Sequence, residues 1–205
     1  MIIEVNPTNI DQRIIQQAVE YLKTGEIIII PTDAVYVLAC DLKNKKALHQ
    51  MAEWKKLKLS KANFSIICSN LSQISDYVKQ IDRNTFRLLK HHLPGPFTFI
   101  LEATTEVSKL FEANKKEIGI RIPDNKIALE LVDKLGNPIA VTTLIDWEDE
   151  IQEYYVDPAE IYERHDDDVA LILDGGLGKL ETSTVVNCTS GSAEIIRQGV
   201  GIIEL

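Results

Sequence analysis

The stretch Glu26-Ile27-Ile28-Ile29-Ile30-Pro31-Thr32-Asp33, residues 26–33, decides the fold class of this chain of 205 residues. Its continuous apolar run has the length of a strand buried on both faces, which is typical of α/β sheets and far shorter than a membrane span. Pro31 ends the strand because proline lacks the N–H that a central strand needs. Thr32 and Asp33 therefore lie just beyond the carboxyl end of a buried strand, where open α/β sheets commonly bind ligands.

Strands and helices alternate along the rest of the chain. Asn9 is predicted as the N-cap of a first helix whose apolar residues recur at helical spacing, and Gly25 ends that helix. Later strands are predicted over 97–102, 139–143, 184–187 and 194–197. No repeat or linker interrupts this pattern, so residues 1–205 are expected to form a single α/β domain. The acidic segment over residues 146–168 is the one candidate insertion.

The charge of the chain is polarised. The 22 Lys and Arg residues face 31 Asp and Glu residues, giving a net charge of −9. Eleven acids against one arginine give −10 over residues 146–168, whereas seven lysines against one glutamate give +6 over residues 43–61. The composition excludes disordered and collagen-like classes. The total charge argues against strong nucleic-acid binding, but the basic stretch leaves a local surface for it.

Several candidate features are missing from the sequence. The start of the chain has no signal-peptide pattern, and the three widely spaced cysteines include no CxxC pair, which together favour a reducing, cytoplasmic location. The four histidines show no metal-ligand spacing. No Walker loop, dinucleotide fingerprint or nucleophile elbow is present, so neither of these two phosphate-binding loops nor a nucleophile of the elbow type is expected.

Polar residues that suit an anion site stand at several predicted strand ends. Arg121 ends the strand near residues 118–122, and Arg197 ends the last strand. Thr143 and Ser183 add hydroxyl groups at two further strands. Guanidinium and hydroxyl groups together bind phosphate or carboxylate. Ordinary turn and surface roles are the alternative, because every α/β protein carries polar residues at such positions.

Taken in order, several of these segments match one known family. They are residues 31–36 (PTDAVY), the helix end at Lys55, 94–101 (PGPFTFIL), 118–123 (IGIRIP), 138–143 (PIAVTT), 183–186 (STVV) and 195–199 (IIRQG). In this order and spacing they resemble the YrdC/YciO family of threonylcarbamoyl-AMP synthase-like proteins, over nearly the whole chain. The resemblance implies a YrdC/RibB-like twisted open mixed sheet with flanking helices around a deep concave cavity.

The resemblance also implies a chemistry. Family synthases combine L-threonine, bicarbonate and ATP into threonylcarbamoyl-adenylate for the t6A modification of tRNA, releasing pyrophosphate. Mg²⁺ would arrive with ATP and be held by substrate phosphates and water, with no protein-bound metal and no membrane partner. Carried over by position, the threonine site comprises Thr32, Tyr36 and Thr143, and the nucleotide and phosphate site comprises Lys55, Arg121, Ser183 and Arg197.

The chain departs from the synthase pattern at two motifs. Leu57 stands where the synthases have the Arg of Lys-x-Arg, and Ile145 where they have the Asn of Ser-x-Asn. Ala34 and Val37 replace a hydroxyl residue and a glycine. These departures resemble the YciO branch. Since a charged hydrogen bond contributes about 1.5–3 kcal/mol, their loss is expected to weaken ATP turnover.

Two functions stay open at this point. The first is an ATP-dependent nucleotidyltransferase, or a relative that binds an adenylate. The second is a translation-associated module that binds tRNA or double-stranded RNA, as family members are associated with doing, without efficient synthase activity. The lysines that would serve it are Lys43, Lys45, Lys46, Lys56, Lys58 and Lys61. A solvated helix face is the alternative for these lysines.

Overall fold

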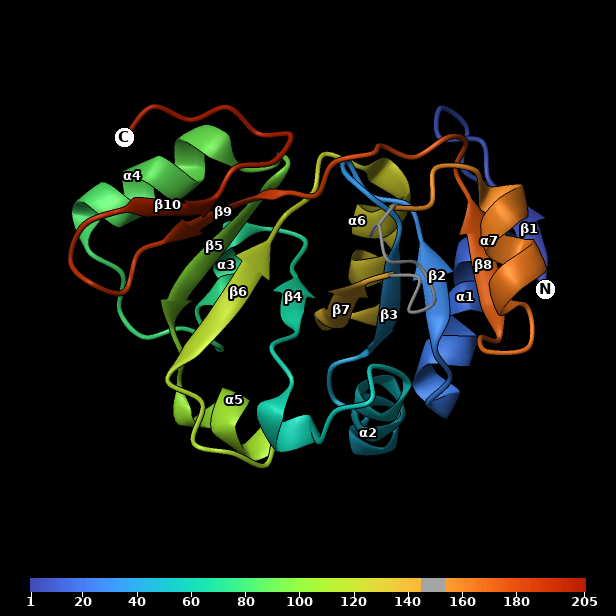
Figure 1. Ribbon diagram of the computed structural model, residues 1–205, viewed down its shortest axis with the longest axis horizontal. Helices are drawn as coiled ribbons and strands as arrows, with labels where there is room; N and C mark the ends of the chain where they lie inside the picture. Colours follow the sequence, from blue (N-terminus) through green and yellow to red (C-terminus); the bar gives the residue numbers. More distant parts are fainter. Residues whose placement is uncertain (145–153) are drawn as a thin grey trace.

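Ten strands form one mixed sheet in a computed structural model that describes residues 1–144 and 154–205. The strand order is β1-β8-β2-β3-β7-β4-β6-β5-β9-β10, with helices on both sides (Figure 1). This confirms the predicted mixed α/β sheet with flanking helices. The strands are β1 (Ile2–Glu4), β2 (Ile28–Ile30), β3 (Val37–Asp41), β4 (Ser65–Ile67), β5 (Phe97–Glu102), β6 (Glu117–Arg121), β7 (Ile139–Thr143), β8 (Leu171–Asp174), β9 (Thr184–Asn187) and β10 (Glu194–Arg197).

The strand pairing is both parallel and antiparallel. The strand β8 runs parallel to both β1 and β2, β4 parallel to β6, and β5 parallel to β9, whereas β3 is antiparallel to both its neighbours. The strand β2 is buried along its whole length, as its unbroken isoleucine run predicts. It ends before Pro31, so the chain leaves the sheet at Thr32 and Asp33.

The helices divide the core into two layers. The first layer is built where α1 and α6 pack against the sheet through Ile15, Leu22 and Leu131. The second contains Phe99, Met51 and Ile161. The helices are α1 (Gln12–Thr24), α2 (Lys45–Trp54), the 3-10 helix η1 (Leu59–Lys61), α3 (Leu71–Ile74), α4 (Arg83–His92), α5 (Thr105–Leu110), α6 (Lys126–Leu135) and α7 (Pro158–His165).

The first helix begins two residues later than predicted. Asp11 is the N-cap of α1, because its carboxylate accepts from the backbone N–H of Arg13 at 2.9 Å. The backbone N–H of Asn9 instead donates to the side chain of Asn6, in a turn that precedes the helix. The predicted end is confirmed, since Gly25 takes the left-handed conformation with φ of 88°.

The acidic segment contains a helix that its charge had obscured. The helix α7 lies beside β8 (Figure 1), and its Ile161 and His165 side chains are buried. Asp157 caps it, and Pro158 occupies the first turn, where a missing N–H costs nothing. Residues 145–153, which include Ile145 and part of the acidic segment, lie outside the described residues. Across the ranges 1–144 and 154–205, none of the helices is long and apolar enough to cross a bilayer.

Candidate functional site

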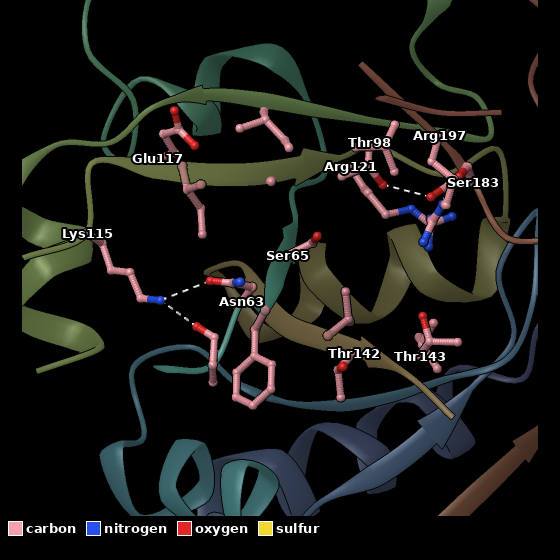
Figure 2. A pocket seen from close by; sticks show the side chains of 18 of the residues that line it. Asn63, Ser65, Thr98, Lys115, Glu117, Arg121, Thr142, Thr143, Ser183 and Arg197 are labelled. Atoms are coloured by element: carbon pink, nitrogen blue, oxygen red, sulfur yellow. Dashed lines mark hydrogen bonds between the residues drawn. The ribbon is translucent and has the colours of Figure 1, made fainter. Parts of the chain in front are cut away.

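A cavity of about 340 Å³ lies between two groups of strands. The strands β5, β6 and β9 wall one side and β3 and β7 the other, while β4 joins the two groups in the sheet order (Figure 2). Its volume falls within the range of small-molecule sites, about 300–1,000 Å³. Strand alternation selects the side chains that face it: Ile120 packs in the core, whereas its neighbours Gly119 and Arg121 line the cavity.

Arg121 stands at one end of this cavity. Only 4% of the residue is exposed, and its guanidinium donates to the Asp33 carboxylate at 2.9 Å. The second oxygen of Asp33 accepts from the backbone N–H of Asp124 at 2.8 Å. The Nε–H of Arg121 is buried and meets no acceptor among the residues that the structure describes. A buried guanidinium with an unused donor is a strong site for an anion.

Arg197, Ser183 and Thr98 complete the cationic end (Figure 2). The guanidinium of Arg197 donates to the Ser183 carbonyl at 2.9 Å, and the hydroxyls of Ser183 and Thr98 share a hydrogen bond of 2.8 Å. Burial lowers the pKa of Arg121, the Asp33 carboxylate opposes that shift, and the positive charge of Arg197 adds to it. Two positive charges so close together favour a bound anion.

Thr143 faces this end from β7, and Lys55 lies beside it. The Lys55 ammonium donates to the Thr143 carbonyl at 3.1 Å, next to the cavity wall. Only 9% of Lys55 is exposed, and this burial lowers the pKa of its ammonium group. The sequence had placed both residues at the site, and the structure brings them together with Arg121, Ser183 and Arg197 around or beside one cavity.

Thr32 and Tyr36 do not line the cavity. The Thr32 hydroxyl donates to the Val35 carbonyl at 2.8 Å and accepts from the Ala34 N–H at 3.0 Å, so it closes its own turn. The Tyr36 hydroxyl donates to the Gly176 carbonyl at 2.6 Å and accepts from a neighbouring backbone N–H. Burial raises the Tyr36 pKa to about 12. Their roles in threonine binding remain predictions.

The opposite end of the cavity was not identified from the sequence. Lys115 donates from its ammonium to the Ala62 carbonyl at 2.6 Å and to the Asn63 side-chain oxygen at 3.2 Å (Figure 2). Burial is the main reason why the pKa of Lys115 is lowered, and the positive charge of Lys61 lowers it further. Neither Asn63 nor Lys115 stands in a motif, and the β4–β6 pairing that brings these segments together is visible only in the fold.

The predicted basic surface is exposed apart from Lys55. Lys45 lies 3.7 Å from the Glu112 carboxylate, and Lys56 takes a left-handed conformation with φ of 54° after α2. Leu57, which stands in place of an arginine, is 45% exposed. The exposed lysines are Lys43, Lys45, Lys46, Lys56, Lys58 and Lys61. Among the described residues, no group of three His, Cys, Asp or Glu side chains could hold a metal ion.

The fold and the cavity define an α/β protein with a pocket that has two arginines at one end. The Sua5/YciO/YrdC family model, whose description is telomere recombination, matches residues 20–199. The chain belongs to this family.

Relatives in the family match along nearly their full length. A protein of Haemophilus influenzae is 40% identical over 96% of this chain and 94% of its own. YciO of Escherichia coli is 37% identical over 98% of this chain and 96% of its own. The crystal structure of E. coli YciO superposes with a TM-score of 0.88, covering 98% of this chain and 97% of that one.

More distant relatives carry a named activity or ligand. The mouse threonylcarbamoyl-AMP synthase is 29% identical over 92% of this chain and 68% of its own. Sua5 of P. abyssi, in a crystal structure with L-threonine, has a TM-score of 0.87 at 24% identity, covering 97% of this chain and 57% of that one. The comparison with Sua5 of P. abyssi shows a shared fold.

Proposed function

We propose that the cavity binds ATP or an adenylate together with an L-threonine-type ligand. The observation that carries this proposal is the buried Arg121 guanidinium, with an unused Nε–H, beside Arg197 in a cavity of about 340 Å³. A phosphate placed there would accept from both guanidinium groups. The hydroxyls of Ser183, Thr98 and Thr143 would orient its remaining oxygens.

The relatives are the second support for a ligand of the threonine and adenylate class. Sua5 of P. abyssi is known with L-threonine, and the mouse relative is named a threonylcarbamoyl-AMP synthase. We extend that ligand class to this chain. In this proposal a carbamate of threonine and bicarbonate attacks the α-phosphorus of ATP and pyrophosphate leaves, which yields threonylcarbamoyl-adenylate for the t6A modification of tRNA.

The protein's part in such a reaction is positioning and charge neutralisation. No protein nucleophile takes part, since the carbamate oxygen itself forms the new bond to phosphorus. The Lys55 ammonium donates to the Thr143 carbonyl at 3.1 Å, and since an ammonium has three N–H donors, this bond does not prevent a contact with a phosphate at this end of the cavity. Mg²⁺ would enter as part of the ATP substrate, held by phosphates and water. The exposed Leu57 offers no donor, so turnover is expected to be slower than in a synthase.

Calorimetric titration of ATP and AMP, with and without L-threonine, tests the proposal. Arg197→Met should weaken nucleotide binding by about tenfold or more, since it removes a charged donor. Arg87→Met is the matched control because Arg87 is an exposed residue of α4 that does not line the cavity. Pyrophosphate release with threonine and bicarbonate then tests synthesis. Absence of nucleotide binding by the unaltered protein would overturn the proposal.

A second candidate function rests on the six exposed lysines of residues 43–61. They form a local basic surface on a chain whose net charge is −9. If this surface binds tRNA or duplex RNA, the affinity falls steeply with salt, and Lys46→Glu with Lys58→Glu weakens it. Lys134→Glu, an exposed lysine of α6, is the control. Binding that is absent, or independent of salt, counts against this function.

A further inference from the structure

The end of the cavity opposite Arg121 holds an amide whose orientation is fixed. The Asn63 side-chain oxygen accepts from the Lys115 ammonium at 3.2 Å, while the same ammonium donates to the Ala62 carbonyl at 2.6 Å. Because an ammonium group only donates, it selects the oxygen of Asn63 and turns the NH₂ group away. No described residue accepts a hydrogen bond from that NH₂ group.

A fixed amide of this kind presents one donor next to one acceptor. The Asn63 oxygen has two lone pairs and Lys115 occupies one, so the second can still accept. An asparagine amide pairs with adenine in two hydrogen bonds, accepting from the N6 amino group and donating to N7. Hypoxanthine has an oxygen at position 6, which would face the Asn63 oxygen without a proton between them.

The spacing of the cavity suits a nucleotide laid along it. The strands β4 and β6 are parallel with Ile67 opposite Arg121, and Asn63 precedes Ile67 by four residues. At a rise of about 3.3 Å per residue, Asn63 and Arg121 are set about 13 Å apart along the strands. Figure 2 shows Asn63 and Lys115 at one end of the cavity and Arg121 at the other.

The cavity between these ends can take a flat ring. Gly119 has no side chain, and a Cβ there would come 2.6 Å from the Ser65 hydroxyl oxygen, so a larger residue on β6 would push Ser65 toward the cavity. Phe111, Ile100 and Val185 line the cavity around it. Apolar walls with a polar group at each end match a nucleotide whose phosphate lies at Arg121, whose ribose lies in the middle and whose base lies at Asn63.

We propose that Asn63 reads the edge of an adenine base, and that Lys115 is the positioning residue that holds the Asn63 amide in the reading orientation. This inference rests on the proposed function, since the phosphate bound at Arg121 sets where the base lies. It adds selectivity for an amino-bearing purine, set by two side chains outside the family motifs that the sequence displays.

The affinities of AMP and IMP, measured by calorimetry on the full chain, test the inference. The unaltered protein should bind AMP at least about tenfold more tightly than IMP, in line with one bidentate base contact. Asn63→Ala should bring the AMP-to-IMP ratio close to one. Lys115→Met should also lower the ratio, because the freed amide can turn its NH₂ group toward the hypoxanthine oxygen. Lys116→Met, at the neighbouring exposed lysine, should leave it unchanged.

The outcomes separate the two proposals. If the unaltered protein binds AMP and IMP equally, or if Asn63→Ala keeps the preference, the inference about Asn63 is overturned while the proposed function stands. If Lys115→Met keeps the full preference, its positioning role is overturned. If the unaltered protein binds neither nucleotide, the proposed function fails and the inference fails with it. Asn63→Ser replaces Asn63→Ala if the latter does not fold, as judged by thermal melting.

Discussion

Arg121 and Asp33 form an ion pair whose side chains are 5% and 9% exposed. Arg121→Met would leave the Asp33 carboxylate buried without its counter-charge, and we expect the free energy of unfolding to fall by about 3–5 kcal/mol. Urea denaturation measures this loss. The control is Arg13→Met, which breaks the pair with Asp11 at the surface and should leave stability close to that of the unaltered protein. Equal losses in the two variants would contradict this account of Arg121.

Tyr36 tests whether a family position is used for folding or for binding. Its hydroxyl joins the Gly176 carbonyl and the Gly175 N–H at 2.6 Å and 3.1 Å. Tyr36→Phe removes both hydrogen bonds from a buried turn, so the free energy of unfolding should fall by about 1–3 kcal/mol. If the hydroxyl serves the fold alone, threonine affinity measured by calorimetry should stay unchanged, since Tyr36 does not line the cavity. A loss of threonine affinity without a loss of stability would instead assign Tyr36 to the ligand.

At the scale of single elements, Gly136 ends α6 in a conformation that other residues avoid. Its φ is 82°, and a Cβ placed there would meet no atom within 4 Å. Gly136→Ala therefore carries a backbone penalty without a steric clash, and we expect the free energy of unfolding to fall by about 1–2 kcal/mol. Gly136→Asn should cost less, because asparagine tolerates the left-handed region. Denaturant midpoints of the two variants check this order, and no loss in Gly136→Ala would contradict it.

The elements that could be predicted are those with local signals. The strand β2 follows from an isoleucine run and the end of α1 from Gly25, since each depends on residues near it in the chain. The start of α1 was misassigned because Asn9 and Asp11 are both good caps, and only the folded turn shows that Asn6 engages the backbone at Asn9. The helix α7 was missed although Asp157 and Pro158 form a start signal, because its charge was attributed to an insertion.

For the whole molecule, the cationic end of the cavity was more predictable than its other end. Arg121, Ser183 and Arg197 carry motifs, so a resemblance can place them. Asp33 also lies in a motif, but its contact with Arg121 joins residues far apart in sequence and depends on the fold. Asn63 and Lys115 carry no motif at all. What sequence reasoning could not supply is the pairing of side chains from distant strands.

At the scale of the whole molecule, buried tyrosine and cysteine side chains make the stability of the folded protein fall at alkaline pH. Burial raises the pKa of Tyr36 and Tyr77 from 10 to about 12 and that of Cys68 from 9 to about 12. In the unfolded chain these groups lose protons first, so it binds fewer protons than the folded protein above pH 9. Their contribution is complete below pH 9 and is lost as the pH rises toward 12. Thermal melting at pH 8 to 11 should show a falling Tm, with a shallower fall above pH 10 in Tyr77→Phe than in the unaltered protein. A Tm that stays level to pH 11 would show that these groups ionise in the folded protein as readily as in the unfolded chain.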